Sequence, residues 1–456
     1  MTMQESNATQ ETPAHPRSER GGAVTAAEAP QPDVAKIHLD PHVSYDAYAE
    51  LRAKAPVARV SFCVEGKEGE VAPEFRAFMA RDHLFVTRYE QVISALLDSR
   101  FSADPRSAMT PEQQKKLPPL PEELRPIERS ILSADPPDHG RLRKLVQPSF
   151  SARAMEALRP RVQQITDELL DDAARAAAER GEAAPDRAME LVKAFAYPLP
   201  VTVICDMLGI PREDREQVRG WTENLLKVNR RGRELEEEAR AGMRQFTAYL
   251  RDLFAEKRRR PTDDMISQLI RAEEDGDKLD EDEVLSMVLI LFLAGHVTTV
   301  NLIGNGVFGL LTHPDQLAKL KADPGLVKGM VEETLRCWGP VDFISRRIAK
   351  EDLELGGTAI PRGEPIMVGL ASANRDPERF ANPEVFDISR PDADRHIAFG
   401  KGIHLCVGAP LARMEGQIAF ETLFRRFPDL RLAVPAGEVR WGESVLRGLA
   451  RLPVLF

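Results

Sequence analysis

Hydrophobic residues recur every three or four positions through most of the chain after residue 40, and this spacing predicts a mainly helical protein. Proline residues set several of the helix ends: Pro261 stops one long helix, and the pair His313-Pro314 stops the next. Two shorter helices follow, with Pro324 between them. The longer helices that we expect cover residues 45–55, 89–97, 154–179, 190–208, 213–228, 233–259 and 280–312.

Extended segments interrupt this pattern and predict small sheets, most of them in the C-terminal third at residues 343–349, 353–360 and 364–370. Residues 103–138 are rich in proline and irregular, and they are too long for an ordinary connection, so we expect a functional loop. The fold class predicted from these elements is mainly α (α+β), a large helical domain with small β-sheets.

The N-terminal residues 1–33 are rich in Ala, Glu, Pro, Ser and Thr and contain almost no large apolar side chains. Such a segment cannot bury enough surface to offset the entropy of ordering, so we expect a disordered tail. We find no internal repeat, and we expect residues 34–456 to form a single domain.

Composition narrows the possible functions. The 62 Lys and Arg against 72 Asp and Glu give a net charge of −10, which excludes a generally basic nucleic-acid-binding protein. The four cysteines are too scattered for a disulfide scaffold or a CxxC zinc site, which favours a reducing cytoplasm. The longest nearly unbroken apolar run, residues 284–295, is shorter than the about 20 residues of a spanning helix, so we expect neither a membrane segment nor a signal peptide.

The most informative segment lies near the C-terminus and reads Phe399-Gly400-Lys401-Gly402-Ile403-His404-Leu405-Cys406-Val407-Gly408-Ala409-Pro410. A helical pattern follows it, so the cysteine precedes a helix N-terminus, where free N–H groups and the helix dipole stabilise a thiolate. Pro410 suits the first helical turn because it lacks an N–H that would be unused there. The glycines allow the backbone to approach a flat ligand closely. The alternative is a buried structural cysteine after a glycine-rich turn.

This segment resembles the cysteine-ligand loop of the cytochrome P450 family. The resemblance implies the cytochrome P450 fold, with haem b sandwiched between the long central helix and this loop. Cys406 would be the metal ligand, and the cofactor-binding residues of the loop would be Phe399, Gly400, His404 and Gly408. Cys63, Cys205 and Cys337 are expected to be ordinary small apolar residues.

Two further motifs agree with the resemblance. Glu333 and Arg336 resemble its Glu-x-x-Arg pair, and their i,i+3 spacing places them on one helix face. By resemblance Arg390 completes a structural triad, with Arg379 as the second choice. We expect this triad to hold the fold behind the cysteine loop and to do no chemistry.

The family's His-x-x-x-Arg motif is matched by His139 and Arg143, which share a helix face and would donate to a haem propionate. By resemblance Arg347 and His404 complete the propionate-binding set, with Arg346 as the neighbouring alternative to Arg347.

The long helix over residues 280–312 carries Ala294, Gly295 and Thr298, which resemble the family's oxygen-side catalytic residues. Family members usually have an acid before the threonine, but this chain has Val297. The usual proton route is therefore in doubt. The alternative for Thr298 is a purely structural bond back to the carbonyl four residues earlier.

The resemblance implies a haem-thiolate monooxygenase that activates O2 with electrons from a ferredoxin and an NAD(P)H-dependent ferredoxin reductase, docking near residues 141–144. It would hydroxylate or epoxidise an apolar small molecule, a macrolide, another polyketide or a peptide. Two alternatives stay open. One is a haem-thiolate enzyme that performs coupling, rearrangement or peroxide-driven oxidation, and the other is a non-catalytic haem-binding sensor.

Overall fold

The computed structural model describes residues 35–38, 44–63, 82–115, 122–183, 186–223, 233–274, 279–442 and 446–456. Residues Val34–Phe456 form one compact unit. The prediction of a disordered tail over residues 1–33 lies outside the described residues.

Helices make up most of this unit, and the fold class predicted from the sequence is confirmed. The helices are α1 Ser44–Lys54, α3 Tyr89–Leu97, α4 Pro105–Ala108, α5 Pro111–Gln114, α6 Arg125–Glu128, α7 Asp138–Val146, α8 Ala152–Glu179, α9 Pro198–Leu208, α10 Arg215–Glu223, α11 Arg233–Arg259, α12 Met265–Glu274, α13 Glu281–Thr312, α14 Pro314–Ala322, α15 Val327–Trp338, α16 Leu370–Ala373 and α17 Ala409–Arg426.

The strands form three sheets. The largest has the order β1-β2-β3-β9-β6-β4, in which β1 pairs with β2 and β3 with β9 in parallel, while the other neighbours are antiparallel. Its strands are β1 Ala35–His38, β2 Val57–Cys63, β3 His83–Val86, β9 Pro365–Val368, β6 Ile344–Ala349 and β4 Phe101–Ser102. The smaller sheets are β10 Arg431–Leu432, β11 Pro453–Leu455 and β5 Ala188–Glu190, and the hairpin β7 Leu353–Leu355 and β8 Thr358–Ile360.

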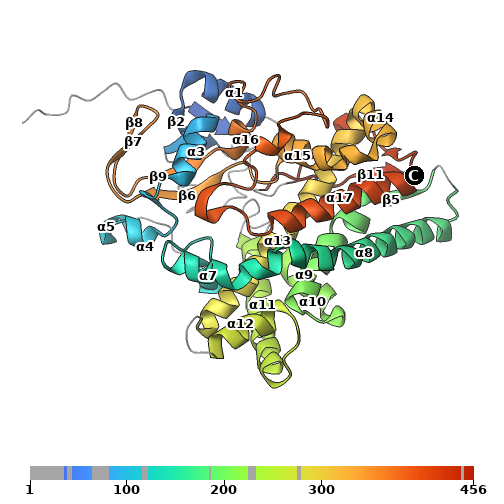
Figure 1. Ribbon diagram of the computed structural model, residues 1–456, viewed down its shortest axis with the longest axis horizontal. Helices are drawn as coiled ribbons and strands as arrows, with labels where there is room; N and C mark the ends of the chain where they lie inside the picture. The colour runs from blue at the N-terminus through green and yellow to red at the C-terminus, as the bar shows by residue number, and fades with distance from the viewer. Residues whose placement is uncertain are drawn as a thin grey trace, which may run out of the picture. The chain divides into compact units, whose positions relative to one another are not determined.

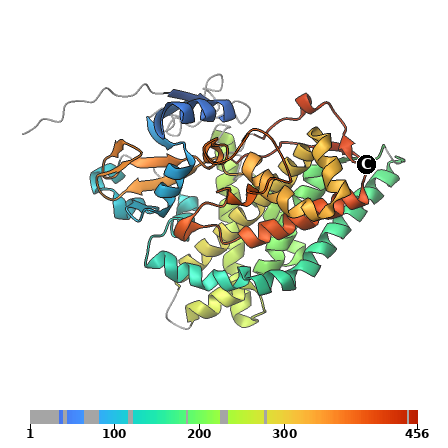
Figure 2. The ribbon, with the colours of Figure 1, turned by 45° about the horizontal axis from the view of Figure 1, so that its top comes forward.

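The largest sheet and the long helices occupy different regions of this unit (Figure 1, Figure 2). Helix α13 runs through the helical region and packs against α9, α15 and α17. Its start is fixed by a capping box, in which Asp280 and Glu283 each accept a hydrogen bond from the other's backbone N–H. Gly306 and Gly309 let the rings of Phe420 and Trp338 pack directly against its backbone. The helix therefore lies in a fixed register against its neighbours.

By length and composition alone, α13 is apolar enough to cross a membrane, although the longest apolar run in the sequence had indicated no spanning helix. Of its most apolar window, 72% is buried inside the protein. The helix is apolar because it forms the core.

One predicted helix is wrong in part. Residues 190–208 begin with the end of β5, continue as a π-helical turn over Val192–Ala196, and become the α-helix α9 only at Pro198. Pro198 lacks the N–H that would continue the preceding turn, and it is suited to a first helical position. The predicted strand over residues 353–360 is the hairpin β7–β8, because Gly356 and Gly357 adopt positive φ between the two strands. The irregular segment 103–138 contains the short helices α4, α5 and α6.

Candidate active site

A cavity of about 440 Å³ lies between α13 and the segment that carries Cys406. The fold brings together residues that are far apart in the sequence, from α7, α13, β6 and the cysteine loop. All the predicted cofactor-binding and catalytic residues line this one cavity: His139, Arg143, Ala294, Gly295, Thr298, Arg347, Phe399, Gly400, His404, Cys406 and Gly408.

The cysteine loop is held by its own backbone. The Cys406 N–H donates to the Phe399 carbonyl over 3.0 Å. Gly402 has φ +75°, and a Cβ there would lie 2.7 Å from the Leu96 carbonyl oxygen, so only glycine fits against the end of α3. Burial raises the pKa of the Cys406 thiol, and the N–H groups of Gly408 and Ala409 at the start of α17 oppose that shift. These donors are aimed at the sulfur, as a thiolate ligand requires.

The other described cysteine side chains are unsuited to bind a metal in this cavity. Cys205 and Cys337 are buried, and burial raises the pKa of each thiol to about 12. The side chain of Cys63 lies outside the described residues. Cys406 is therefore the one described cysteine that lines the cavity.

One end of the cavity is basic. The rings of His139 and His404 lie 4.5 Å apart, and Arg143 donates to the carbonyls of Ile403 and Leu405 over 3.2 and 2.7 Å. Arg347 lines the same end and is 6% exposed. The side chain of Arg346 lies outside the described residues.

The polar groups at this end fit an anionic ligand. His139 Nε2 is buried and has no hydrogen-bond partner among the described residues. Burial and the nearby Arg347 lower the pKa of His404 to about 3, and burial and Arg143 lower the pKa of His139. Asp135, the acid that opposes both shifts, already accepts hydrogen bonds from Ser102 and the Ala103 N–H. A ligand carboxylate would bind here, so the residues present fit a haem propionate.

Helix α13 forms the opposite wall. Thr298 Oγ1 donates to the Ala294 carbonyl over 3.0 Å, which is the structural bond considered from the sequence, and Thr298 also lines the cavity. A Cβ at Gly295 would lie 3.1 Å from Ile204 Cδ1, so packing against α9 already favours glycine there. Val297 is not among the described residues that line the cavity.

Sequence reasoning missed Glu415, which is fully buried on α17. Neither carboxylate oxygen has a hydrogen-bond partner of acceptable geometry among the described residues. Burial raises its pKa to about 8, and the hydroxyl of Thr299, which lines the cavity, opposes the shift. A signal existed in the sequence, because position 415 lies on the helix face of Leu411 and Ile418, where the pattern calls for an apolar residue.

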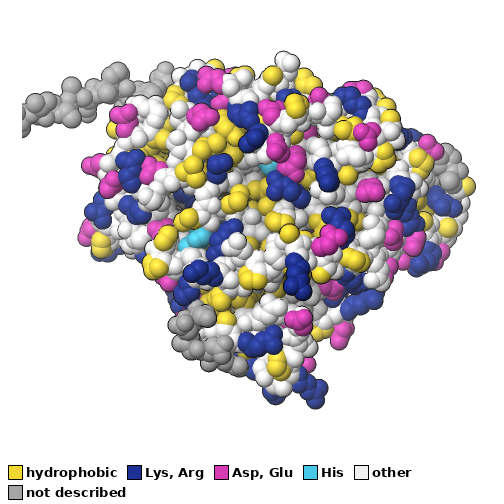
Figure 3. All heavy atoms as spheres, viewed as in Figure 1, with side chains coloured by type: hydrophobic (Ala, Val, Ile, Leu, Met, Phe, Trp, Pro, Cys, Tyr) yellow, Lys and Arg dark blue, Asp and Glu magenta, His cyan; other side chains and the backbone are white. Residues whose placement is uncertain are grey.

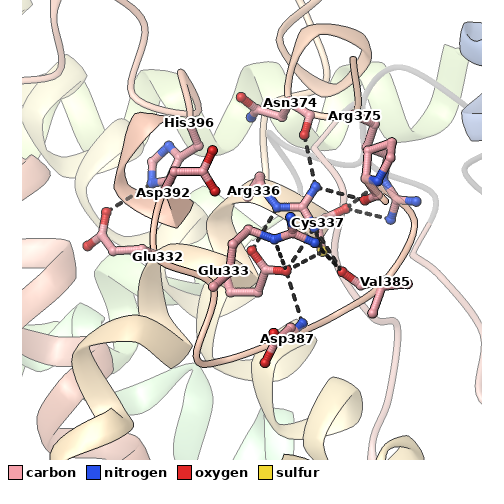
Figure 4. Close-up of polar contacts among 12 residues, drawn as sticks. Glu332, Glu333, Arg336, Cys337, Asn374, Arg375, Val385, Asp387, Asp392 and His396 are labelled. Atoms are coloured by element: carbon pink, nitrogen blue, oxygen red, sulfur yellow. Dashed lines mark hydrogen bonds and ion pairs between the residues drawn. The ribbon is translucent and has the colours of Figure 1, made fainter. Parts of the chain in front are cut away.

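Behind the loop, Glu333 and Arg336 lie together (Figure 4), and Arg390 pairs with the same glutamate. Glu333 accepts from Arg336 Nε and Nη2 over 2.7 and 2.8 Å and from Arg390 Nε over 3.1 Å. Arg379, the second choice, pairs with Asp392 instead. None of the three triad residues is among the described residues that line the cavity.

Comparisons with known proteins agree with this geometry. The family description "Cytochrome P450" matches residues 74–324 and 325–432. Cytochrome P450 107B1 of Saccharopolyspora erythraea is 46% identical over 84% of this chain and 92% of its own length. The polyketide biosynthesis cytochrome P450 PksS of Bacillus subtilis is 43% identical over 81% of this chain and 88% of its own. The crystal structure of the myxobacterial cytochrome P450 CYP267B1 in complex with myristic acid is 41% identical, with a TM-score of 0.79 over 91% of this chain and 96% of that one.

Proposed function

Because the chain belongs to the cytochrome P450 family and is therefore a haem-containing monooxygenase of secondary metabolism, we propose that it hydroxylates or epoxidises an apolar polyketide or a related natural product. The observation that carries this proposal is the single cavity in which Cys406 and the basic end face helix α13. A reducing cytoplasm suits the free thiol that the reaction needs.

We assign the cofactor as haem b, with Cys406 as its ligand and His139, Arg143, Arg347 and His404 as the donors to its propionates. When bound there, the haem supplies the ability to react with O2 and to transfer single electrons, which side chains cannot provide. The chain's own contribution is to orient the cofactor, exclude water and supply protons.

The remainder of the cavity supports an apolar substrate. Away from the basic end and the cysteine loop, most of the described residues that line it are aliphatic or aromatic, among them Ile131, Leu132, Ile290, Val341 and Phe343. Apolar burial would therefore supply most of the binding free energy. The polyketide-biosynthesis relative and the myristic acid complex are in keeping with a large apolar substrate.

Glu415 is our candidate for the missing acid. With a pKa of about 8 it holds a proton at neutral pH, and the Thr299 hydroxyl is the polar group between it and the cavity. A proton would leave Glu415, pass along the Thr299 hydroxyl, and reach the cavity beside Thr298. A general acid is most effective when its pKa is near the working pH, and Glu415 meets that condition.

Electrons would come from a ferredoxin and its NAD(P)H-dependent reductase. Lys and Arg side chains lie on the face that carries α7, α8 and α17, among hydrophobic side chains and some Asp and Glu side chains (Figure 3). These Lys and Arg side chains would contact an acidic partner. Within the stretch 141–144, Lys144 is exposed, but Arg141 pairs with Glu283 over 2.6 Å, so Lys144 is the better candidate contact.

The test is a set of turnover assays on the haem-loaded protein with polyketide lactones. We expect an oxygenated product with O2 and a ferredoxin system, and no such product from the Cys406→Ser variant. Product from peroxide alone, or coupled and rearranged products without added oxygen, would favour the atypical chemistry. Spectral shifts on ligand binding without any turnover would favour a sensor.

A further inference from the structure

A second ion-pair network lies beside the Glu333 triad and reaches the cysteine loop. Its centre is Glu332, whose two carboxylate oxygens accept from Arg413 Nε and Nη2 over 2.7 and 2.8 Å. Glu332 Oε2 also lies 3.1 Å from His396 Nε2 (Figure 4). Since His396 Nδ1 accepts from the Ala398 N–H, Nε2 carries the proton and donates to Glu332.

The three side chains come from three elements that the chain must hold together. Glu332 belongs to α15, His396 precedes the cysteine loop, and Arg413 lies in the second turn of α17, which follows Cys406. The side chains of Glu332 and Arg413 are 14% and 34% exposed, while that of His396 is 1% exposed. Burial alone would raise the pKa of Glu332, but the hydrogen bonds from Arg413 and His396 lower it to about 2.

Both of Glu332's partners contact Phe399. The Arg413 guanidinium carbon lies 4.6 Å from the centre of the Phe399 ring, and the His396 ring lies 5.8 Å from it. Phe399 in turn accepts the backbone hydrogen bond from Cys406 and lines the cavity. Glu332 thus fixes two groups that hold the residue against which the cysteine is anchored.

We infer that Glu332, His396 and Arg413 are positioning residues for the cysteine ligand, and we name them the Glu332 clamp. The clamp keeps Phe399 and the backbone of residues 399–406 in the one arrangement in which the Cys406 sulfur faces the cavity. This role is distinct from that of Glu333, whose bonds run to the segment before the loop. It rests on Cys406 being the ligand, and it holds whichever substrate binds.

The experiment uses the haem-loaded protein and follows the thiolate signature of its reduced carbon-monoxide complex. Losing a charge-assisted hydrogen bond corresponds to about a tenfold change in an equilibrium or rate. We therefore expect the reduced carbon-monoxide complexes of Glu332→Gln and Arg413→Gln each to lose the thiolate signature at least about tenfold faster than that of the parent. Arg413→Lys, which keeps the charge and one donor, should restore part of the difference.

A matched control is available on two other helices, α8 and α9. Arg161 pairs with Asp206 over 2.9 Å, and the two side chains are 35% and 22% exposed, close to the values for Arg413 and Glu332. Arg161→Gln should lower the melting temperature as much as Arg413→Gln does, yet keep the parental conversion rate and midpoint potential.

Three results would overturn the inference. If the clamp variants lost the thiolate signature no faster than Arg161→Gln, the clamp would contribute only to general stability. Glu332→Gln removes a negative charge and Arg413→Gln a positive one. If the two variants changed the conversion rate and the midpoint potential in opposite directions, the effect would come only from charge near the cofactor. If Glu332→Gln or Arg413→Gln could not retain haem while Arg413→Lys behaved as the parent, the network would be needed for folding and not for positioning the cysteine. Failure of the cysteine assignment is recognised separately, since Cys406→Ser would then keep the signature.

Discussion

Two glutamates in this protein are equally inaccessible to solvent but differ in their hydrogen-bond partners. Glu333 and Glu415 are both 0% exposed. Glu333 accepts hydrogen bonds from Arg336, Arg390 and the Asp387 N–H, whereas neither oxygen of Glu415 has a hydrogen-bond partner of acceptable geometry among the described residues. Burial by itself therefore does not decide what a carboxyl group does. Its partners hold the Glu333 side chain in one place, whereas burial without such partners raises the pKa of Glu415 to about 8.

The strongest test of this contrast is Glu333→Gln. Removing one member of a buried ion pair leaves Arg336 and Arg390 buried without compensation, which typically costs about 3–5 kcal/mol. We expect a loss of that size in urea unfolding at pH 7, together with loss of haem on dialysis. A variant that unfolds at the parental urea concentration would show that the guanidinium groups find sufficient partners among the backbone carbonyls of residues 374–385, which they already contact.

Glu415→Gln should have the opposite sign and depend on pH. A carboxyl whose pKa is raised on folding from 4.5 to about 8 stabilises the folded protein below pH 4.5, and that stability is lost as the pH rises to about 8. The neutral amide has no such loss, so the variant should gain about 2–4 kcal/mol over the parent between pH 5 and pH 9. Urea midpoints at pH 5, 7 and 9 measure this, and parallel curves for the two proteins would contradict it.

The same substitution should cost function. Losing a positioned acid typically lowers a rate about 100- to 10,000-fold. We expect Glu415→Gln to fall into the lower part of that range, with less product per NADPH consumed and more peroxide, because water supplies protons without control. If coupling stays parental while Thr298→Ala uncouples, the proton reaches the cavity by another path.

Thr299→Val should have a smaller effect than Glu415→Gln, because it changes the surroundings of Glu415 and keeps the carboxyl group. The hydroxyl opposes the raised pKa of Glu415, so its loss should raise that pKa further and move the pH dependence of turnover toward higher pH. The expected loss of stability is below about 1 kcal/mol, the usual net value of a neutral hydrogen bond, because Thr299 and Glu415 form no hydrogen bond of acceptable geometry. The pH–rate profile is the measurement, and an unchanged profile would separate Thr299 from Glu415.

The smallest effect belongs to Arg379→Gln. Arg379 pairs with Asp392, and its side chain is 28% exposed, so its removal should cost about 0–1 kcal/mol. Thermal melting beside Arg390→Gln compares the two candidates for the third triad position. A larger loss for Arg379→Gln would reverse our assignment.

Local spacing carried most of what the sequence could predict. The mainly helical fold class and the long helices follow from periodicity and prolines, whereas the roles of the positions around Cys406 came from the resemblance to the cytochrome P450 family. The region around Pro198 was misjudged because an apolar run does not reveal whether it enters a strand, a π-turn or a helix.

Apart from the triad that the resemblance supplied, hydrogen-bond partners could not be predicted from the sequence, because they depend on residues distant in the chain. The family resemblance predicted the arginine partners of Glu333, but Glu415 appears in the sequence only as an acid in a helical pattern, and only the packed structure shows its surroundings. The same applies to Glu332, whose partners lie 64 and 81 positions further along the sequence. A motif locates a carboxyl group, but its neighbours determine its protonation.

Consecutive glutamates on α15 serve two different networks, and this has a consequence for how the gene can change. Successive helical residues point about 100° apart, so Glu332 and Glu333 address separate partners only in the present register. Deleting or inserting one codon upstream within α15 would turn both side chains together and disconnect both networks at once. A single substitution here removes interactions that a compensating substitution can restore. An insertion or deletion of one codon cannot be compensated in this way, so we expect this helix to accumulate substitutions while its length stays fixed.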